Sequence, residues 1–529
     1  MGQMEMPESA KTGRLAFVNR KQESLHRYSV EGAMIRNVYQ LLGTPAWMRT
    51  ALDRVLSHTG SRSPGIDGKT RDDYQTEVAK ALLAAEIVAE MRSKAYRPKP
   101  VRRTHIPKAS DPTKLRPLGI ATIKDRTVQE AVRMILEPIY EPKFHPHSYG
   151  FRPFRSAHHA MYRIHFLASR PGDAAYEWVV EGDIRDCFGS IDHSVLLGIL
   201  RRTIDDRPLL KLMSLMLQAG ALDGLRYLPS EAGTPQGSGV SPLWANIYLS
   251  ELDQFIARKY AALGDWAKRR LAEQHEVVPC EIIRYADDFV VMVRGSREDA
   301  EQLKQQIAEF LKVDLHMDLS QEKTLVTHIR DGFSFLGFEV RKITLRREGR
   351  SRVWIRPSNK AIQRFRTNVT DVLRRLATSP NEVALIRALN ALIRGWSRYF
   401  AIGVCWPTFR SLSTWLWHRV NDALYRKHKG RRYRSWARQA RDYWIPYSRS
   451  DSPADRWRRG RGIGVWLDGS RTEACLLMPP AHTPWQPIVP SGATIPTILR
   501  IGKSCLLVEQ RSTLRAPATS DQHTLDRRA

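Results

Sequence analysis

The sequence predicts an α+β fold in which a region of mixed strands and helices is followed by an all-helical region. Between about residues 170 and 340, short β-type runs at 178–180, 282–283 and 290–293 alternate with amphipathic helical stretches. This alternation indicates a sheet with helices packed on it. Beyond about residue 355 the apolar spacing is that of helices. A chain of 529 residues has room for roughly three or four domains.

The N-terminal region is predicted to be helical to about residue 60. The apolar residues that support this recur at helical spacing, at Met34, Val38, Leu41 and Leu42. The segment 63–68, Ser-Pro-Gly-Ile-Asp-Gly, is typical of a loop, and a further helix is expected over 77–91. A Pro- and Arg-rich segment follows at 97–103.

Two later helix starts carry clear signals. Ser241 and Pro242 supply an N-cap and a first-turn proline. The helix after them has an apolar stripe formed by Trp244, Ile247, Tyr248, Leu252 and Phe255. Residues 379–382, Ser-Pro-Asn-Glu, fit a capping box that begins another helix.

The charge of the chain points to a polyanionic partner. Lys and Arg number 84 against 55 Asp and Glu, a formal net charge of +29. Such a surface attracts nucleic acid through salt-sensitive counterion release. A basic surface of the ribosomal type, without a specific site, is the alternative at this point.

The five cysteines form no CxxC pair, so the sequence indicates neither a zinc site nor a disulfide framework. The N-terminus lacks the apolar segment of a signal peptide, and no apolar run is long enough to span a membrane. We therefore expect reduced thiols in a soluble intracellular protein.

Three aspartates are candidates for chemistry. Asp287 and Asp288 lie between apolar, strand-like runs, as at the tip of a buried hairpin, and Asp183 follows another short apolar strand. Phosphoryl transfer with two divalent cations needs carboxylates gathered on a rigid platform. Such carboxylates repel one another, which is hard to explain without cations. A solvated turn is the alternative for an isolated Asp-Asp pair.

The segment 285–288, Tyr-Ala-Asp-Asp, resembles the YxDD signature of reverse transcriptases, and other blocks follow in that family's order. The blocks are 116–120 (Arg-Pro-Leu-Gly-Ile), 125–129, 148–157 (beginning Ser-Tyr-Gly-Phe-Arg-Pro), 233–237 (Gly-Thr-Pro-Gln-Gly), 241–246, 320–324, 335–338 (Phe-Leu-Gly-Phe) and 394–400 (Arg-Gly-Trp-Ser-Arg-Tyr-Phe). Over about residues 30 to 445 the chain is similar to the multifunctional proteins encoded by bacterial group II introns.

The resemblance implies a right-hand polymerase with a helical thumb or maturase domain. It implies an RNA-binding N-terminal extension at 1–62, fingers at 63–170, a palm at 171–340 and the helical thumb at 341–450. The basic, then Pro-rich tail at 451–529 is expected to contact DNA through its basic segment. It is expected to contain no endonuclease, because Cys pairs and a His-rich metal pattern are absent from it.

The resemblance also assigns roles. Asp183, Asp287 and Asp288 are implied as catalytic, metal-binding carboxylates, with Ile184 offering its backbone carbonyl to a pair of Mg²⁺ ions, for which Mn²⁺ is the expected substitute. The implied dNTP-binding residues are Lys108 and Arg116 at the triphosphate, Phe188 under the sugar, Gln236 near the nascent base pair, and Lys323 at the pyrophosphate. The residues alone would also fit another interpretation, in which Phe188 belongs to the core and Lys108 and Arg116 are solvated surface cations.

The helical region 355–450 interleaves aromatic residues with cations, a composition suited to stacking bases and following phosphates. The predicted RNA-binding residues are Arg394, Trp396, Arg398, Arg426, Lys427, Arg431, Arg432 and Arg434. The alternative is a helical domain whose aromatics form its core and whose cations are solvated. That the RNA is a group II intron is implied only by the family.

The sequence departs from the family pattern at four places. Gly189 stands where Asp is common, and Phe154 stands where a smaller or basic residue is common. The order Ser-Gly-Val at 238–240 replaces Gly-Val-Ile, and Trp244 replaces Leu. None of these changes removes a predicted metal ligand, so they bear on the subfamily and on substrate preference.

Together these features predict an RNA-directed DNA polymerase with maturase activity that assists intron splicing and mobility. The expected partners are a structured RNA, an RNA template, a DNA primer or target and dNTPs, with no membrane. The expected location is the bacterial cytoplasm, in association with RNA or the nucleoid. Two alternatives stay open: an RNA-binding splicing factor without polymerase activity, and an intron-independent enzyme of repair or phage defence.

Overall fold

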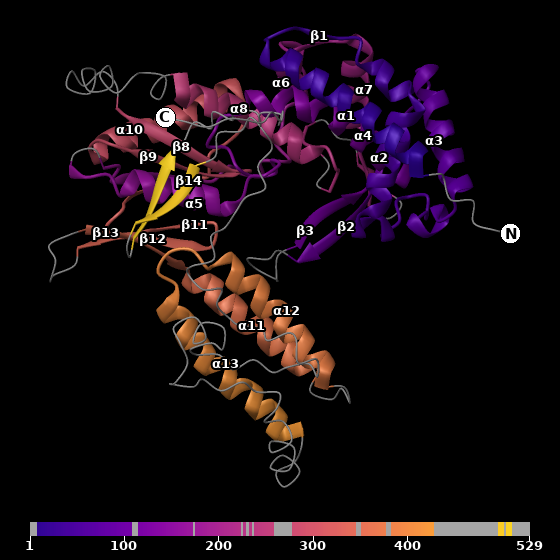
Figure 1. Ribbon diagram of the computed structural model, residues 1–529. Helices are drawn as coiled ribbons and strands as arrows, with labels where there is room; N and C mark the ends of the chain where they lie inside the picture. The colour runs from indigo at the N-terminus through magenta and orange to yellow at the C-terminus, as the bar shows by residue number, and fades with distance from the viewer. Residues whose placement is uncertain are drawn as a thin grey trace, which may run out of the picture. The chain divides into compact units, whose positions relative to one another are not determined.

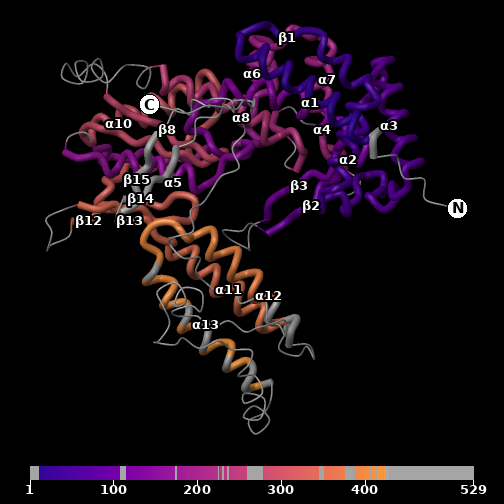
Figure 2. Tube along the Cα trace, in the orientation of Figure 1, coloured from indigo at the N-terminus to yellow at the C-terminus, as the bar shows by residue number. Residues whose placement is uncertain are grey.

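The computed structural model describes most of the chain up to residue 427 and two short segments beyond it (Figures 1 and 2). The described ranges are 8–107, 115–172, 175–223, 226–228, 232–234, 237–258, 278–344, 351–376, 382–427, 496–501 and 504–509. The chain divides into two compact units, 1–481 and 482–529. In the second unit, β14 (Pro496–Ile501) and β15 (Ser504–Glu509) form an antiparallel hairpin. No helix among the described residues is long and apolar enough to cross a membrane.

Four helices form the N-terminal layer: α1 (Glu8–Val30), α2 (Pro45–Ser57), α3 (Glu77–Arg92) and α4 (Ile123–Tyr140). The helix predicted around residues 34–42 is wrong in its first half. Gly32, with φ of 72°, follows the end of α1, and β1 (Ile35–Arg36) then pairs with β5 (Ile204–Asp205). The rest is the short 3-10 helix η1 (Tyr39–Gly43).

A small sheet lies next in the chain, with strand order β3-β2-β6-β7. Its strands are β2 (Val101–Pro107), β3 (Leu115–Ile120), β6 (Ala221–Asp223) and β7 (Arg226–Leu228). β2 pairs antiparallel with β3 and parallel with β6. The pairing with β6 brings two segments that are about a hundred residues apart in sequence into one sheet.

The central sheet has strand order β10-β4-β9-β8, and every neighbouring pair is antiparallel. Its strands are β4 (Trp178–Gly182), β8 (Cys280–Tyr285), β9 (Asp288–Val293) and β10 (Leu325–His328). Both faces are buried: Val180 and Val291 join one hydrophobic core, while Val179 and Val290 join another. Burial on both faces explains why these strands are continuous apolar runs rather than alternating ones.

Helices cover one face, and a helix and a second sheet cover the other (Figure 1). The first core contains α6 (His193–Arg201), α7 (Arg207–Gln218), α8 (Ser241–Ile256) and α10 (Arg297–Asp314). The second contains α5 (Ala157–Ala168) and the sheet of β11 (Phe333–Phe335), β12 (Phe338–Thr344) and β13 (Ser351–Pro357).

Three helices follow: α11 (Asn359–Leu376), α12 (Glu382–Tyr399) and α13 (Trp406–Lys427). They share a core of their own whose members recur at helical spacing, such as Phe365, Val369, Leu389, Ile393, Leu412 and Leu416. Figure 1 shows them as a group of orange helices. We call these helices the three-helix bundle. The predicted capping box at 379–382 lies mostly outside the described residues.

The mixed strand-and-helix architecture confirms the predicted α+β class at this level. The strands expected at 178–180, 282–283 and 290–293 are β4, β8 and β9, and the expected helix at 77–91 is α3. Ser241 is the first residue of α8 rather than its N-cap, which is Val240. The cysteines at 187, 280 and 405 are buried thiols.

Candidate active site

The predicted Asp-Asp pair lies at a tight turn between β8 and β9. Tyr285 pairs with Asp288, so Ala286 and Asp287 alone form the turn. Ala286 adopts a left-handed conformation, with φ of 61°. Gly150 lies directly against this turn: a Cβ atom on it would be 2.2 Å from the backbone nitrogen of Ala286. Only glycine lets the two backbones approach this closely.

A fully buried arginine, Arg284, braces the turn from inside. Its guanidinium forms a bidentate pair with Asp253, at 2.8 and 2.6 Å. It also donates to Asn246 Oδ1 at 2.9 Å, to Ser148 Oγ at 2.9 Å and to the carbonyl of Ala286 at 2.9 Å. A buried charge is stable only when it is paired and hydrogen-bonded in this way. The turn is therefore anchored to α8 and to the loop before α5.

Asp183 lies immediately after β4, the strand that pairs with β9. Its carbonyl accepts a hydrogen bond of 2.8 Å from the backbone of Ser320, and the next residue, Ile184, bridges to Leu319. The carboxylate of Asp183 is 3.0 Å from Nζ of Lys323. The structure thus brings Lys323, which is distant in sequence, to Asp183, and the family resemblance had assigned both residues to one site.

The carboxylates interact electrostatically across the strand ends. Partial desolvation and the nearby charges of Asp287 and Asp183 raise the pKa of Asp288 to about 6, and Lys323 opposes the shift. Among the described residues, no three acidic, His or Cys side chains converge tightly enough to hold a metal ion as they stand. The acids are close enough to repel one another, and Lys323 occupies an oxygen of Asp183.

The loop containing Phe188 is joined to the segment that begins at Gly233. The carbonyl of Phe188 accepts a hydrogen bond of 2.8 Å from the backbone of Thr234. The ring of Phe188 is half-buried against the first core. Gln236 lies outside the described residues, but Gly237 is placed: a Cβ atom there would be 2.7 Å from the carbonyl of Gly119 in β3. The segment therefore runs from the Phe188 loop to β3.

The same loop gives a physical reason for glycine at 189. A Cβ atom on Gly189 would lie 2.2 Å from the carboxylate of Asp186. Gly233, with φ of 85°, approaches from the other side, and a Cβ atom on it would be 2.9 Å from Cα of Gly189. An Asp at 189 would bring a second carboxylate against that of Asp186.

One of the two predicted triphosphate-binding cations lies on the hairpin of β2 and β3. Arg116 is exposed on β3, opposite Ile106. Lys108 lies outside the described residues. The position of Gly237 against β3 shows that this hairpin and the 233–237 segment are neighbours.

Cations are exposed on the three-helix bundle, while Trp396 packs against other aromatic rings. Arg398 and Arg426 are exposed and Arg394 is half-buried. Trp396 lies among the rings of Phe365, Phe400 and Phe409, with centroids 4.7 to 5.5 Å apart. These contacts account for Trp396 as a core residue. The side chain of Lys427 and residues Arg431, Arg432 and Arg434 lie outside the described part.

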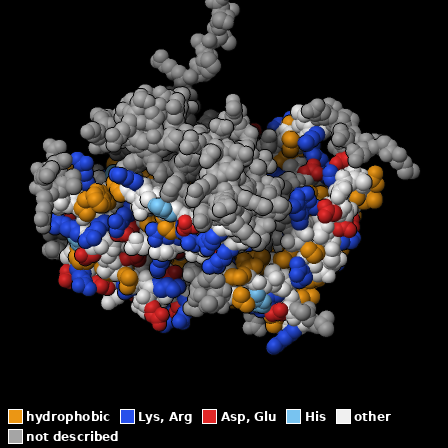
Figure 3. Space-filling view, turned by 90° about the horizontal axis from the view of Figure 1, so that it is seen from below, with side chains coloured by type: hydrophobic (Ala, Val, Ile, Leu, Met, Phe, Trp, Pro, Cys, Tyr) orange, Lys and Arg blue, Asp and Glu red, His pale blue; other side chains and the backbone are white. Residues whose placement is uncertain are grey.

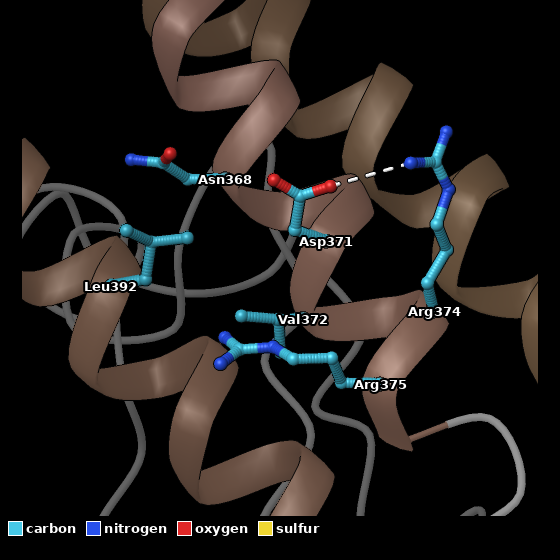
Figure 4. A pocket seen from close by; sticks show the side chains of 6 residues that line it. All are labelled: Asn368, Asp371, Val372, Arg374, Arg375 and Leu392. Carbon is cyan, nitrogen blue, oxygen red and sulfur yellow. Dashed lines mark hydrogen bonds and ion pairs between the residues drawn. The ribbon is translucent and has the colours of Figure 1, made fainter. Parts of the chain in front are cut away.

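Lys and Arg side chains also lie in several groups on the described part of the face seen in Figure 3. On the bundle, a hollow of about 630 Å³ opens between α11 and α12, with Asn368, Arg375 and Leu392 in its lining. In Figure 4, Arg375 extends from α11 toward α12, whereas Arg374 points away and pairs with Asp371 at 3.4 Å. This hollow combines a cation, an amide and apolar side chains.

One residue near the site was not predicted. Tyr399, at the end of α12, donates a hydrogen bond of 2.9 Å to the carbonyl of Leu336, and its ring stacks on Phe338. Burial and the charges of Tyr285 and Asp288 raise its pKa to about 12. The end of α12 therefore lies near the hairpin of β8 and β9. The Arg-Gly-Trp-Ser-Arg-Tyr-Phe block contains Tyr399, but sequence spacing gave no sign of this long-range contact.

Two family descriptions match the chain. Residues 106–340 match the reverse transcriptase (RNA-dependent DNA polymerase) family. Residues 362–444 match the group II intron, maturase-specific domain. The first range includes the whole central sheet, and the second spans most of the three-helix bundle.

Curated relatives agree with both matches. The chain is 32% identical to the group II intron-encoded protein LtrA of Lactococcus lactis subsp. cremoris over 461 residues, which covers 74% of this chain and 75% of that protein. It is 34% identical to protein YkfC of Escherichia coli, covering 64% and 91%. It is 27% identical to a putative COX1/OXI3 intron 2 protein of Saccharomyces cerevisiae, covering 58% and 39%.

Proposed function

The chain belongs to the group II intron-encoded proteins, RNA-directed DNA polymerases that carry a maturase domain, and we propose that its three aspartates catalyse two-metal nucleotidyl transfer. In this proposal the central sheet is the palm, the β2–β3 hairpin belongs to the fingers, and the three-helix bundle is the thumb. The observation that carries it is the electrostatic coupling of Asp288 to Asp287 and Asp183 at the ends of adjacent strands.

The donor set fits magnesium. Carboxylate and carbonyl oxygens are the ligands Mg²⁺ prefers, and Asp183, Asp287, Asp288 and the carbonyl of Ile184 would hold it. The chemistry supplied by a pair of Mg²⁺ ions, with Mn²⁺ as the expected substitute, is stabilisation of the attacking and leaving oxygens in phosphoryl transfer. Burial and the charges of Asp287 and Asp183 raise the pKa of Asp288, and bound cations would relieve the repulsion among these carboxylates.

The remaining residues would orient the nucleotide. Phe188 lies on the loop after Asp183, where a ring beneath the sugar would exclude a 2′-hydroxyl. Gln236, which lies outside the described residues, would contact the incoming base pair. Arg116 and Lys108 would hold the triphosphate from the β2–β3 hairpin. Lys323, already 3.0 Å from Asp183, is placed to neutralise charge on departing pyrophosphate.

The maturase role would use the bundle. Exposed Arg398 and Arg426, with Arg394 and the basic residues Lys427, Arg431, Arg432 and Arg434, would contact phosphates of a structured RNA, proposed to be a group II intron. We leave Trp396 out of this surface, because its ring packs against three others. The RNA template, a DNA primer or target and dNTPs are the other proposed partners.

Primer extension tests the proposed chemistry. The wild-type protein should extend a DNA primer on an RNA template with Mg²⁺, and Asp287→Ala should abolish extension while leaving RNA affinity nearly unchanged. Asp331→Ala, which removes an exposed acid outside the site, is the matched control and should retain synthesis.

Substantial synthesis by Asp287→Ala would remove this residue from the metal site. A wild-type protein that binds RNA tightly and specifically, yet extends no primer, would favour a splicing factor without polymerase activity.

A further inference from the structure

The loop before α5 is fixed against the catalytic turn. Gly150 lies against Ala286, and its carbonyl accepts a hydrogen bond of 2.8 Å from Asn246. Two residues earlier, Ser148 forms a parallel bridge with Arg284. Any side chain displayed by the following residues is therefore held at a defined place beside the turn.

Two phenylalanines are displayed there in an unusual conformation. Phe151 and Phe154 have φ of 56° and 58°, a region in which bulky side chains are strained and glycine is favoured. They are 58% and 62% exposed, and neither belongs to a hydrophobic core of the described residues. The strain is thus not offset by burial of either ring.

The residue between them explains how the conformation is held. Arg152 is buried and binds both carboxylate oxygens of Glu141, with its shortest contact at 2.8 Å. It also donates to the carbonyls of His145 and Ser148, at 2.8 and 2.7 Å. This arginine fixes the backbone of the loop. Phe154 is therefore exposed because the backbone of the folded loop holds it in that position.

We propose that Phe154 is a stacking platform for an unpaired base of the RNA template next to the catalytic turn. Four residues separate it from Gly150, so their Cα atoms are at most about 15 Å apart. An exposed aromatic face suits a nucleobase. The next residue in the chain, Arg155, donates a hydrogen bond of 2.9 Å to the carbonyl of Pro146, and its guanidinium lies over the ring of Tyr149.

The template strand is the occupant that this chemistry favours. Bases within the primer–template duplex already stack on one another, whereas an unpaired template base has an open face. The chain carries a net charge of +29, which draws the phosphates of that strand to the protein. The inference rests on the proposed polymerase function and names one contact of its template.

The backbone conformation of Phe154 makes a glycine substitution a suitable test of the proposal. The left-handed backbone at this position accepts glycine without strain. Phe154→Gly is therefore a clean test, because it removes the ring and relieves the backbone. We expect its melting temperature to equal or exceed that of the wild type.

The test uses the full-length protein and RNA templates that carry 2-aminopurine at single unpaired positions, annealed to a DNA primer. Stacking quenches this fluorophore. The wild type should quench one position, Phe154→Gly should lose the quench, and Phe154→Tyr should keep it. The dissociation constant for primer–template should rise by about 5- to 100-fold in Phe154→Gly, with kcat changing little.

Two further variants separate stacking from simple apolar contact. Phe154→Leu should behave like Phe154→Gly, and Leu82→Ala, which removes an exposed apolar side chain from α3, should behave like the wild type. Equal quenching by Phe154→Gly and wild type would overturn the proposal, as would full quenching by Phe154→Leu. A quench on the primer strand alone would overturn the assignment to the template.

These outcomes are distinct from failure of the proposed function. A wild type that extends primers but shows no dependence on residue 154 contradicts only the stacking proposal. A wild type that extends no primer contradicts the polymerase function, whatever the fluorescence shows.

Discussion

The end of the central sheet and the three-helix bundle handle charge in opposite ways. At the sheet end, Asp183, Asp287 and Asp288 lie on a backbone packed between two cores, and burial together with the charges of Asp287 and Asp183 raises the pKa of Asp288 to about 6. On the bundle, the exposed cations Arg398 and Arg426 project from helices that pack on a core of their own. One region concentrates like charges at fixed positions; the other spreads them over a surface.

The contrast is what we expect from the ligands proposed for each region. In-line phosphoryl transfer depends on the position of every ligand, so the carboxylates need a rigid platform. Arg284 supplies part of that rigidity from within the core. Attraction of an RNA backbone depends mainly on the number of cations near phosphates, so single positions matter less. We therefore expect large effects from single changes at the sheet end and small, additive ones on the bundle.

The largest effect is expected from the brace beneath the catalytic turn. Arg284→Ala leaves Asp253 charged and buried, and breaking such a pair costs about 3–5 kcal/mol of folding free energy. Thermal and denaturant unfolding should show this loss. Arg202→Ala, which breaks the largely exposed pair with Glu251, is the matched control and should cost about 1 kcal/mol or less. Equal losses in the two variants would contradict a brace at Arg284.

The next largest effect is expected on sugar selectivity when the ring of Phe188, on the loop after Asp183, is removed. Phe188→Ala should lower the preference for deoxynucleotides over ribonucleotides by about 10- to 100-fold, because the space for a 2′-hydroxyl opens. The ratio of kcat/KM for the two nucleotides measures this preference. Phe188→Tyr keeps the ring and should keep the preference. An unchanged ratio in Phe188→Ala would remove Phe188 from the sugar site.

On the three-helix bundle, each neutralised cation is expected to change the salt dependence of RNA binding by a small amount. The double variant Arg398→Gln, Arg426→Gln should make the plot of log affinity against log salt shallower by about 0.7 to 0.9 for each lost phosphate contact. RNA-binding titrations at several salt concentrations give this slope. Neutralising two exposed cations of α10, Arg297 and Lys312, is the control. The same change of slope in the control would mean that the bundle is no special RNA surface.

Local sequence signals predicted the strands and the turn of the candidate site, because these elements depend on residues that are close together in the sequence. The apolar runs of β4, β8 and β9 are continuous since both faces of the sheet are buried, and the Asp-Asp pair lies at a turn between two of them. Asp183 was placed by its position after β4. The family's ordered motifs then connected these separate segments.

Long-range contacts could not be predicted from spacing. Arg284 looks like an ordinary strand residue, and its partners Ser148, Asn246 and Asp253 come from other elements. The segment after α1 has a helical apolar pattern, yet Gly32 and the pairing of β1 with β5 divert it. Trp396 was expected at an RNA surface because aromatic residues and cations alternate in this region. Composition alone does not tell which face of a helix is buried, so its contacts with three other rings could not be predicted.

The last prediction concerns the melting temperature of Asp288→Asn. It tests the central claim that the three carboxylates repel one another until cations bind between them. The raised pKa of Asp288 means that the folded protein binds its proton more tightly than the unfolded chain does. This contribution stabilises the fold below about pH 4 and is lost as pH rises through about 6. Asp288→Asn removes the repulsion, so its melting temperature should exceed that of wild type at pH 8 and match it near pH 4.

The decisive measurement is therefore the melting temperature of wild type and Asp288→Asn at pH 8, with and without Mg²⁺ at constant ionic strength. We predict that Asp288→Asn melts higher without Mg²⁺, and that Mg²⁺ stabilises the wild type more than the variant. A variant that melts lower at pH 8, together with an equal response of both proteins to Mg²⁺, would contradict a cation site at the end of the central sheet.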